Sequence, residues 1–202
     1  MSVLYPAYLY QSLGDRFPTI STPTINSIDV VSHTMNIRPA TTEDILSIQT
    51  VAEHSWENNY DILTRETARE TVAEWYSKDR LRTDIESDTS LVLVADEERI
   101  VGFSHSAWSG EEETNPAVGT ILRLYVDPDH RRTGIGSRLF EETRTALTEY
   151  GIERIEAMVL AANEPGNDFY RTAGFEQIET GETVIGGETY PENIYRATND
   201  SI

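Results

Sequence analysis

The sequence LRLYVDPDHRRTGIGSRL (residues 122–139) joins a predicted strand to a predicted helix through a loop rich in arginine and glycine. Gly134 and Gly136 allow the backbone to turn tightly and to approach a ligand closely. The first amides of the helix have no partner inside it and lie at its positive end. Together with Arg131 and Arg132, these amides form a predicted cradle for a pyrophosphate. The alternative is an ordinary strand–helix turn with two solvent-facing arginines.

The same stretch determines the predicted topology. Val118–Val126 precedes the helix and Ile155–Leu160 follows it, so these two strands form a right-handed crossover and are parallel. The neighbouring strands pair through hairpins, one of them turning at Gly186 and Gly187. Pro191 predicts that the last strand lies at an edge or contains a bulge. The other predicted strands are residues 36–40, 90–95, 100–108, 175–179 and 188–197, and the helices are about residues 43–56, 65–77, 134–150 and 167–173.

This order of elements predicts an α+β fold of mixed α/β type. We expect one twisted mixed sheet of about seven strands with helices on both faces. The loop is neither a P-loop, because G-x-x-x-x-G-K-[ST] is absent, nor a dinucleotide fingerprint, because the third glycine is missing.

The composition excludes several classes of protein. There are no cysteines, which excludes disulfides, thiolate zinc sites, iron–sulfur clusters and a cysteine nucleophile. A net charge of −19 argues against binding to nucleic acid or to an anionic membrane, and no apolar run approaches the roughly 20 residues that span a bilayer. The acid excess comes with a single lysine, Lys78. We therefore expect a cytoplasmic protein adapted to molar salt, from a halophilic archaeon.

Residues 1–34 differ from the rest of the chain. They have a net charge of −1, are rich in Ser, Thr and Pro, and lack the basic start and long apolar stretch of a signal peptide. We expect an N-terminal extension, mobile or loosely docked, in front of one domain over residues 35–202. A start codon assigned too early is the alternative, because Met35 opens a plausible domain.

Two motifs carry a resemblance to a known family. RRTGIG at residues 131–136 resembles the R-x-x-G-x-G/A signature of the GNAT superfamily of acyl-CoA-dependent N-acyltransferases. NEPGNDFYRTAGF at residues 163–175 is similar to the family pattern N-x-x-A-x-x-[FL]-Y-x-x-x-G-F, with Gly166 where alanine is usual. MNIRPAT at residues 35–41 also resembles a GNAT domain start. In element order, the resemblance extends over about residues 35–197.

The resemblance implies an N-acetyltransferase that moves an acetyl group from acetyl-CoA, its cosubstrate, to a primary amine on a small molecule or a peptide. It implies that the end of the central strand pairs with the pantetheine and that the loop amides hold the pyrophosphate. A backbone N–H near Leu124 or Tyr125 would stabilise the oxyanion, and Tyr170 would protonate the leaving thiolate. The implied cosubstrate-binding residues are Leu124, Tyr125, Val126, Arg131, Arg132, Thr133, Gly134, Ile135, Gly136, Ser137, Asn163 and Tyr170.

The general base is less defined. Many GNAT members have a glutamate on the strand before the loop, whereas residues 120–124 read TILRL and contain no acid. We predict His105, on the preceding strand, as the catalytic base; Glu111–Glu113 and a chain of water molecules are alternatives. Tyr170 has an alternative role as a core aromatic residue. The histidines show no metal-ligand spacing, so no metal is predicted.

The acceptor is expected between the first two helices and the loop of residues 109–116. Two alternatives to an enzyme stay open at this point. The missing strand glutamate favours a catalytically silent acyl-CoA-binding regulator, and a nucleotide-binding protein would prefer ATP or NAD to coenzyme A. A homodimer is also left open. The candidate pocket residues are His54, Trp56, Asn58, Asn59 and Tyr60.

Overall fold

The computed structural model describes residues 35–59, 62–108 and 117–198. The predicted extension of residues 1–34 and the loop of residues 109–116 lie outside this part. The strands are β1 (Asn36–Pro39), β2 (Ser90–Glu97), β3 (Arg99–Trp108), β4 (Val118–Val126), β5 (Arg154–Leu160), β6 (Glu176–Ile185) and β7 (Glu188–Thr198). The helices are α1 (Ile45–Asn59), α2 (Arg65–Trp75), α3 (Lys78–Glu86), α4 (Ile135–Glu149) and α5 (Glu164–Thr172), with short 3-10 turns at Thr42–Asp44 and Pro128–His130.

The described strands form one seven-stranded sheet in the order β1-β2-β3-β4-β5-β7-β6. β4 and β5 are parallel, and every other neighbouring pair of the described strands is antiparallel. The predicted crossover through α4 and the predicted mixed sheet are therefore confirmed. The parallel pair lies in the middle of the sheet, where helices can cover both faces.

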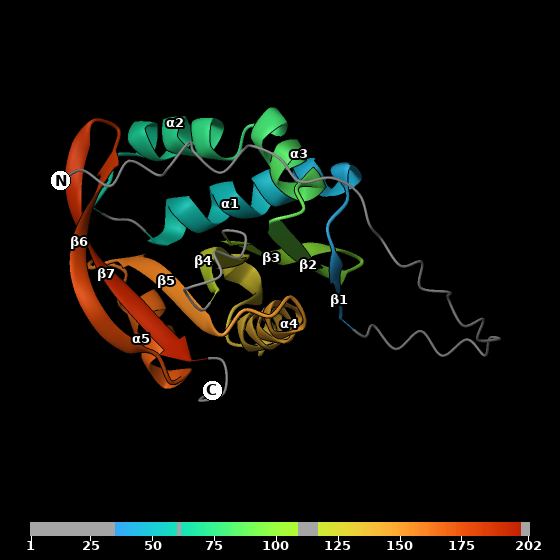
Figure 1. Ribbon diagram of the computed structural model, residues 1–202. Helices are drawn as coiled ribbons and strands as arrows, with labels where there is room; N and C mark the ends of the chain where they lie inside the picture. Colours follow the sequence, from blue (N-terminus) through green and yellow to red (C-terminus); the bar gives the residue numbers. More distant parts are fainter. Residues whose placement is uncertain (1–34, 60–61, 109–116, 199–202) are drawn as a thin grey trace.

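Helices cover the two faces of the sheet unequally (Figure 1). α1, α2 and α3 lie over one face, where a core cluster that includes Ile48, Val72 and Phe103 is buried. α4 and α5 lie over the other face, and their apolar side chains fill two further clusters around Leu139 and Leu147. Burial of these side chains from both faces is the main contribution to the stability of such a layered fold.

Three details of the predicted elements are wrong. Residues 78–86 form α3, which was not predicted. Leu81 is the one fully buried residue of this helix, so the sequence has no broad apolar face at helical spacing there. β6 continues to Ile185 instead of ending at residue 179. Tyr150, the last residue of the helix predicted over residues 134–150, lies just past the end of α4 and is 57% exposed.

The prediction that Pro191 limits the last strand to an edge is also wrong for the strand as a whole. β7 lies between β5 and β6. β5 nevertheless ends at Leu160, which pairs with Glu192. One residue further, the Pro191 carbonyl accepts the Ala161 N–H at 2.9 Å. Proline has no N–H to return that bond, and it lies where the pairing with β5 ends.

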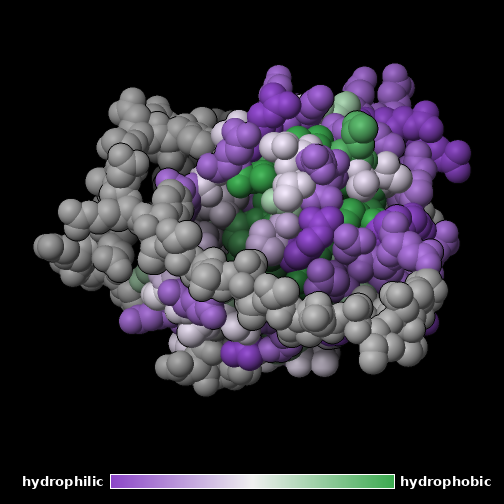
Figure 2. Space-filling view, turned by 90° about the vertical axis from the view of Figure 1, so that its right-hand side faces the viewer, coloured by the Kyte–Doolittle hydropathy of each residue, from purple (hydrophilic) through white to green (hydrophobic). Residues whose placement is uncertain are grey.

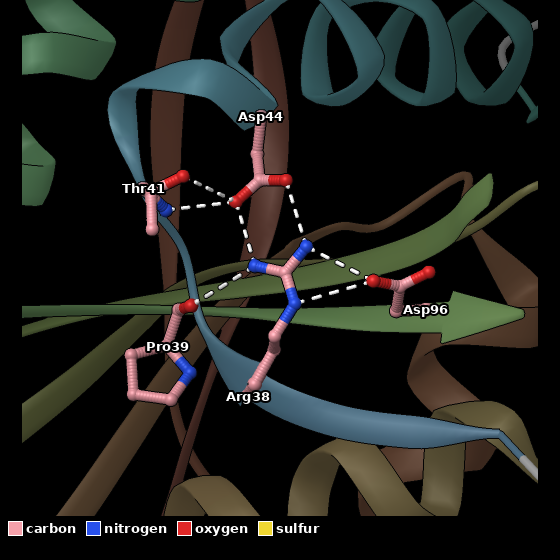
Figure 3. A network of polar contacts seen from close by, with 5 residues as sticks. All are labelled: Arg38, Pro39, Thr41, Asp44 and Asp96. Carbon is pink, nitrogen blue, oxygen red and sulfur yellow. Dashed lines mark hydrogen bonds and ion pairs between the residues drawn. The ribbon is translucent and has the colours of Figure 1, made fainter. Parts of the chain in front are cut away.

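An arginine on β1 ties the first strand to two neighbouring segments (Figure 3). The Arg38 guanidinium donates to both Asp44 carboxylate oxygens, at 2.8 and 2.9 Å, and to Asp96 on β2 at 3.0 Å. Asp44 also accepts the backbone N–H of Thr41 at 2.8 Å. The hydrogen bond from Arg38 lowers the pKa of Asp44 to about 2 against the cost of its burial. Thr41 is thus the N-cap of the first helical segment.

The described surface is mainly hydrophilic, as the acid-rich composition predicts. Figure 2 shows one face of the molecule, on which hydrophilic residues surround a smaller group of hydrophobic ones. Among the described residues, no helix has both the length and the apolar character needed to cross a membrane.

Candidate active site

The central parallel strands separate part-way along the sheet. β4 pairs with β5 over only four residues each, Val118–Ile121 with Arg154–Ala157. On its other side, the register with β3 shifts: Ser106 faces Ile121 and His105 faces Arg123, so Leu122 between them is a bulge. A bulge bends its strand and increases the local twist. Beyond it, β4 and β5 are no longer paired, and a cavity of about 480 Å³ opens beside them.

The cavity has two chemically different halves. The loop half is formed by the β4–α4 loop and the first turns of α4 and α5; its lining includes His130, Arg131, Arg132, Gly134, Gly136, Ser137, Asn163 and Tyr170. The aromatic half lies on the side of α1–α3 and β6–β7; its lining includes Trp56, Trp75, Arg123, Thr183, Ile185 and Glu192. Because side chains from both faces of the sheet line one cavity, the cavity connects the two faces where β4 and β5 separate.

The start of α4 forms the predicted cradle. The first hydrogen bond inside the helix runs from the Arg138 N–H to the Gly134 carbonyl at 3.0 Å, so the amides of Ile135, Gly136 and Ser137 precede the helical ladder. Gly134 has φ = 89°, a conformation that a side chain disfavours. Arg132 has φ = 61°, which is strained for a residue with a Cβ. Such strain is typical of loops shaped for a ligand.

The loop before α4 is held by buried polar contacts. The Asp127 carboxylate, 1% exposed, accepts the Asp129 N–H at 3.1 Å and lies 3.1 Å from Nδ1 of His54. Burial would raise the pKa of Asp127, but these hydrogen bonds and the nearby Arg99 charge hold it below its ordinary value. Arg131 Nε donates to the Val126 carbonyl at 3.2 Å. These contacts hold the loop backbone in place and thereby position the Arg131 guanidinium.

The first turn of α5 is fixed to the end of β5. Asn163 caps the helix, its Oδ1 accepting the Gly166 N–H at 3.1 Å. A Cβ at Gly166 would lie 2.6 Å from Nδ2 of the same asparagine, which explains the glycine where GNAT members usually have alanine. Asn167, which the sequence reading did not single out, donates to the Leu160 carbonyl at 3.0 Å and accepts the Tyr195 hydroxyl at 2.9 Å.

Tyr170 is a core aromatic residue that also borders the cavity. It is 6% exposed, and its ring packs edge-on against Phe169 and Phe175 and stacks on Tyr195 at 6.1 Å. It also lines the cavity. The side chain is thus held rigidly by the core while bordering the space in which a thioester could lie. Its role as the general acid stays a prediction.

His105 lies on β3 beside the cavity rather than in its wall. It is 2% exposed, with Nε2 3.0 Å from the Ser90 hydroxyl and Nδ1 2.6 Å from Nη1 of Arg123. Burial, and then the charge of Arg123, keep the pKa of His105 well below its ordinary value. Because the guanidinium donates, Nδ1 accepts, and the imidazole orients Arg123. A base role for His105 stays a prediction, and Glu111–Glu113 lie outside the described residues.

The aromatic half combines aromatic rings with two charged side chains, Arg123 and Glu192, that belong to no sequence motif. The Trp56 and Trp75 rings meet edge-on at 5.6 Å, and Trp56 Nε1 donates to the Tyr76 hydroxyl at 3.3 Å. The Arg123 guanidinium lies over the Tyr76 ring, 4.8 Å from its centre. Glu192 of β7 is 8% exposed and faces the same space. Its neighbours in the strand, Pro191 and Asn193, are exposed and half-buried, so only the pairing of β7 with β5 reveals the position of Glu192.

The structure brings most of the predicted cosubstrate-binding residues together. Thr133 and Ile135 are not in the cavity wall: the Thr133 hydroxyl donates to the His130 carbonyl at 2.7 Å, and the Ile135 side chain is buried in the core. Of the acceptor candidates, Trp56 lines the cavity, whereas the side chains of residues 58–60 lie outside the described part. The remaining predicted residues all line the cavity: Leu124, Tyr125, Val126, Arg131, Arg132, Gly134, Gly136, Ser137, Asn163 and Tyr170.

Known proteins match both the sequence and the fold. The model of the Acetyltransferase (GNAT) family matches residues 48–175. The chain belongs to the GNAT family. A spermidine N(1)-acetyltransferase of Thermoplasma acidophilum is 28% identical over 150 residues, which cover 72% of this chain and 91% of that protein. A mycothiol acetyltransferase of Propionibacterium freudenreichii is 32% identical over 121 residues, 58% of this chain and 35% of that protein.

A solved GNAT structure supports the donor substrate. The PaiA N-acetyltransferase of Thermoplasma acidophilum, in complex with coenzyme A, superimposes with a TM-score of 0.71 at 25% identity, covering 82% of this chain and 99% of that one. This GNAT chain is therefore an acetyltransferase that uses acetyl-CoA, as predicted. No comparison supports the silent regulator. Within the described residues, no group of three or more metal-ligating side chains is arranged to hold a metal ion.

Proposed function

We propose that this GNAT protein transfers the acetyl group of acetyl-CoA to a primary amine of a small molecule by direct attack. The observation that carries the proposal is the cavity at the separation of β4 and β5, because it joins the loop half to the aromatic half. A donor held in one half and an acceptor entering from the other would meet without a covalent enzyme intermediate.

In this proposal the loop half binds the donor. The amides at the start of α4, with Arg131 and Arg132, hold the pyrophosphate through hydrogen bonds, helix dipole and full charge. The part of β4 beyond its pairing with β5 gives the pantetheine a strand edge to follow. Asn163 stands beside that path, and Tyr170 supplies the proton that the thiolate takes up.

The acceptor is best supported as a small aliphatic amine. Trp56 and Trp75 present aromatic surface, which favours a cationic amine, and Glu192 adds a negative charge. The Thermoplasma acidophilum relative is named for spermidine, which makes a polyamine the first acceptor to assay. A peptide amino group is the competing acceptor.

Turnover with a panel of acceptors tests the function. Release of coenzyme A from acetyl-CoA would be followed with spermidine, a diamine, free amino acids and short peptides, against a control without acceptor. We expect the highest kcat/KM with a polyamine or diamine. Binding of coenzyme A without turnover of any amine would revive the silent regulator. Stabilisation by ATP or NAD, but not by coenzyme A, would contradict donor binding itself.

The remaining proposals concern the cellular environment of the enzyme and the extent of its domain. From charge and composition we propose a cytoplasmic enzyme of a halophilic archaeon that binds neither nucleic acid nor membrane. We also propose that residues 1–34 are an extension of the domain over residues 35–202. Unfolding of the full chain and of residues 35–202, each in low salt and in molar KCl, tests both ideas. Equal stability of the two chains and a large gain in KCl are expected.

A further inference from the structure

Direct attack requires a group that removes a proton from the acceptor, since an aliphatic amine is mostly an ammonium ion near neutral pH. β4 contains no acid. His105 has both ring nitrogens in contact with Ser90 and Arg123 and is absent from the cavity wall. Among the described residues that line the cavity, Glu192 is the one carboxylate.

The fold places Glu192 in the aromatic half of the cavity, beside the end of β5. On β7 it pairs with Leu160, the last residue of β5, and directly paired residues direct their side chains to the same face of a sheet. Leu160 belongs to the core cluster that contains Trp56 and Ile185, so Glu192 faces the side of α1–α3. α5, which carries Tyr170, begins only a few residues after Leu160.

The Glu192 carboxylate is also available. Gly181 is its partner on β6, and a Cβ there would lie 3.4 Å from Glu192 Oε1, so the carboxylate lies over the backbone of a residue without a side chain. Within the described part of the chain, no hydrogen-bond or ion-pair partner holds this carboxylate. Neither of its oxygens is among the fully buried polar atoms that lack a partner, so the carboxylate is open to the cavity and can meet a substrate there.

We propose that Glu192 is the catalytic base, the group that takes a proton from the ammonium of the acceptor. This inference rests on the proposed function and names the residue that activates its acceptor. The ammonium gives one proton to the Glu192 carboxylate, and the freed nitrogen lone pair attacks the thioester carbonyl. The C–S bond then breaks, its electron pair goes to sulfur, and the thiolate takes a proton from Tyr170. The second nitrogen proton restores Tyr170 through solvent, and Glu192 releases its proton to water.

The electrostatic surroundings suit this task. Burial raises the pKa of Glu192 above its ordinary value, which makes the carboxylate a stronger base. The other charged or titratable side chains lining the cavity are Arg123, Tyr125, His130, Arg131, Arg132 and Tyr170. Further along β7, on the same face, Arg196 is engaged by Glu156 of β5 at 2.6 Å. Approach of a cationic acceptor would lower the pKa of Glu192 again, so the carboxylate is in its deprotonated form when the ammonium arrives.

The test measures kcat against pH at saturating acetyl-CoA and acceptor, for the full-length wild type and for Glu192→Gln. The wild type should show an acid limb with a pKa above 4.5, the ordinary glutamate value. In Glu192→Gln, kcat should fall at least 100-fold and the limb should vanish. Its stabilisation by coenzyme A should match the wild type, because glutamine has the same shape and the loop half is unchanged.

Two further variants make the result specific. Glu182→Gln removes an exposed carboxylate from the neighbouring position on β6 and should leave both kcat and its pH profile unchanged. His105→Asn should keep the acid limb. Loss of the limb in His105→Asn but not in Glu192→Gln would overturn the proposal in favour of His105, and wild-type kcat in Glu192→Gln would also overturn it. A wild type without turnover on any amine would instead contradict the proposed function itself.

Discussion

The two halves of the cavity differ in how their residues are distributed along the chain. The loop half comes from two short segments, residues 126–137 and 163–170, in which ligand groups follow a strand and begin a helix. The aromatic half is assembled from α1, α2, β4, β6 and β7, with one or two residues from each. A local motif can specify the first half. The second exists only once the sheet and its helices have packed.

This difference corresponds to a difference in chemistry. Pyrophosphate and pantetheine are constant parts of the donor, and backbone amides at a helix start recognise a pyrophosphate in any fold that provides them. In the proposed function, the acceptor is recognised by single side chains on separate elements, such as Trp56, Arg123 and Glu192. Substitutions in the loop half should therefore alter donor binding or chemistry, and those in the aromatic half should alter acceptor use.

The largest effect on catalysis is expected at Tyr170. Replacing it with phenylalanine keeps the ring contacts with Phe169 and Phe175 but removes the hydroxyl, so kcat should fall by about 100-fold or more while the Kd for coenzyme A stays unchanged. Tyr195→Phe is the matched control: it removes a hydroxyl bonded to Asn167 in the same core. It should lower stability by about 1 kcal/mol and leave kcat within a few-fold. Equal kcat losses in both variants would show that packing, not proton transfer, explains Tyr170.

The next effect is expected at Gly134. Valine at φ = 89° strains the backbone of the cradle, so the Kd for acetyl-CoA should rise about tenfold or more, as measured by calorimetry. Gly151→Val imposes similar strain, at φ = 75°, beyond the end of α4 and away from the cavity. It should lower stability without changing the Kd. An unchanged Kd in Gly134→Val would mean that the loop does not hold the donor.

A smaller effect is expected at Arg123 in the aromatic half. With spermidine as acceptor, Arg123→Gln removes a like charge from the cavity, and an interaction of about 1 kcal/mol corresponds to a KM about fivefold lower. The KM for acetyl-CoA should stay the same. Arg171→Gln, on the exposed surface of α5 beside Asp168, is the control and should change neither constant. If Arg123→Gln changed only the KM for acetyl-CoA, the assignment of the acceptor to the aromatic half would be contradicted.

Asp44→Asn, outside both halves, should have the smallest effect on catalysis. It should leave both KM values unchanged but lower the free energy of unfolding at pH 7 by about 1–2 kcal/mol, because Arg38 loses its closest partner and is itself partly solvated. The pKa of Asp44 is about 2 when folded and 3.8 ordinarily, so its contribution is complete above about pH 4 and lost towards pH 2. Urea unfolding across this range should show a smaller acid loss in the variant; parallel curves would contradict the assignment.

Much of the architecture follows from local patterns. The strand–loop–helix order around Gly134 predicts the parallel pair, and the order of strands and helices along the chain predicts a sheet with helices on both faces. α3 escapes prediction because its nine residues, KDRLRTDIE, contain only one that is fully buried. Pro191 wrongly predicts an edge strand. A proline is excluded from a central strand only where its missing N–H would have to donate to a neighbouring strand, and this depends on where β5 ends.

The loop half of the cavity could be predicted from the order of residues alone, because glycine conformations, helix amides and arginines act over a few consecutive positions. The aromatic half depends on the packed sheet. β4 and β5 separate beyond the bulge at Leu122. The pairing of β7 with β5 places Glu192 beside that separation. The contact with Arg123 occupies Nδ1 of His105. Contacts between residues tens of positions apart leave no periodic trace in a sequence, since burial and pairing assign their roles only after the chain has folded.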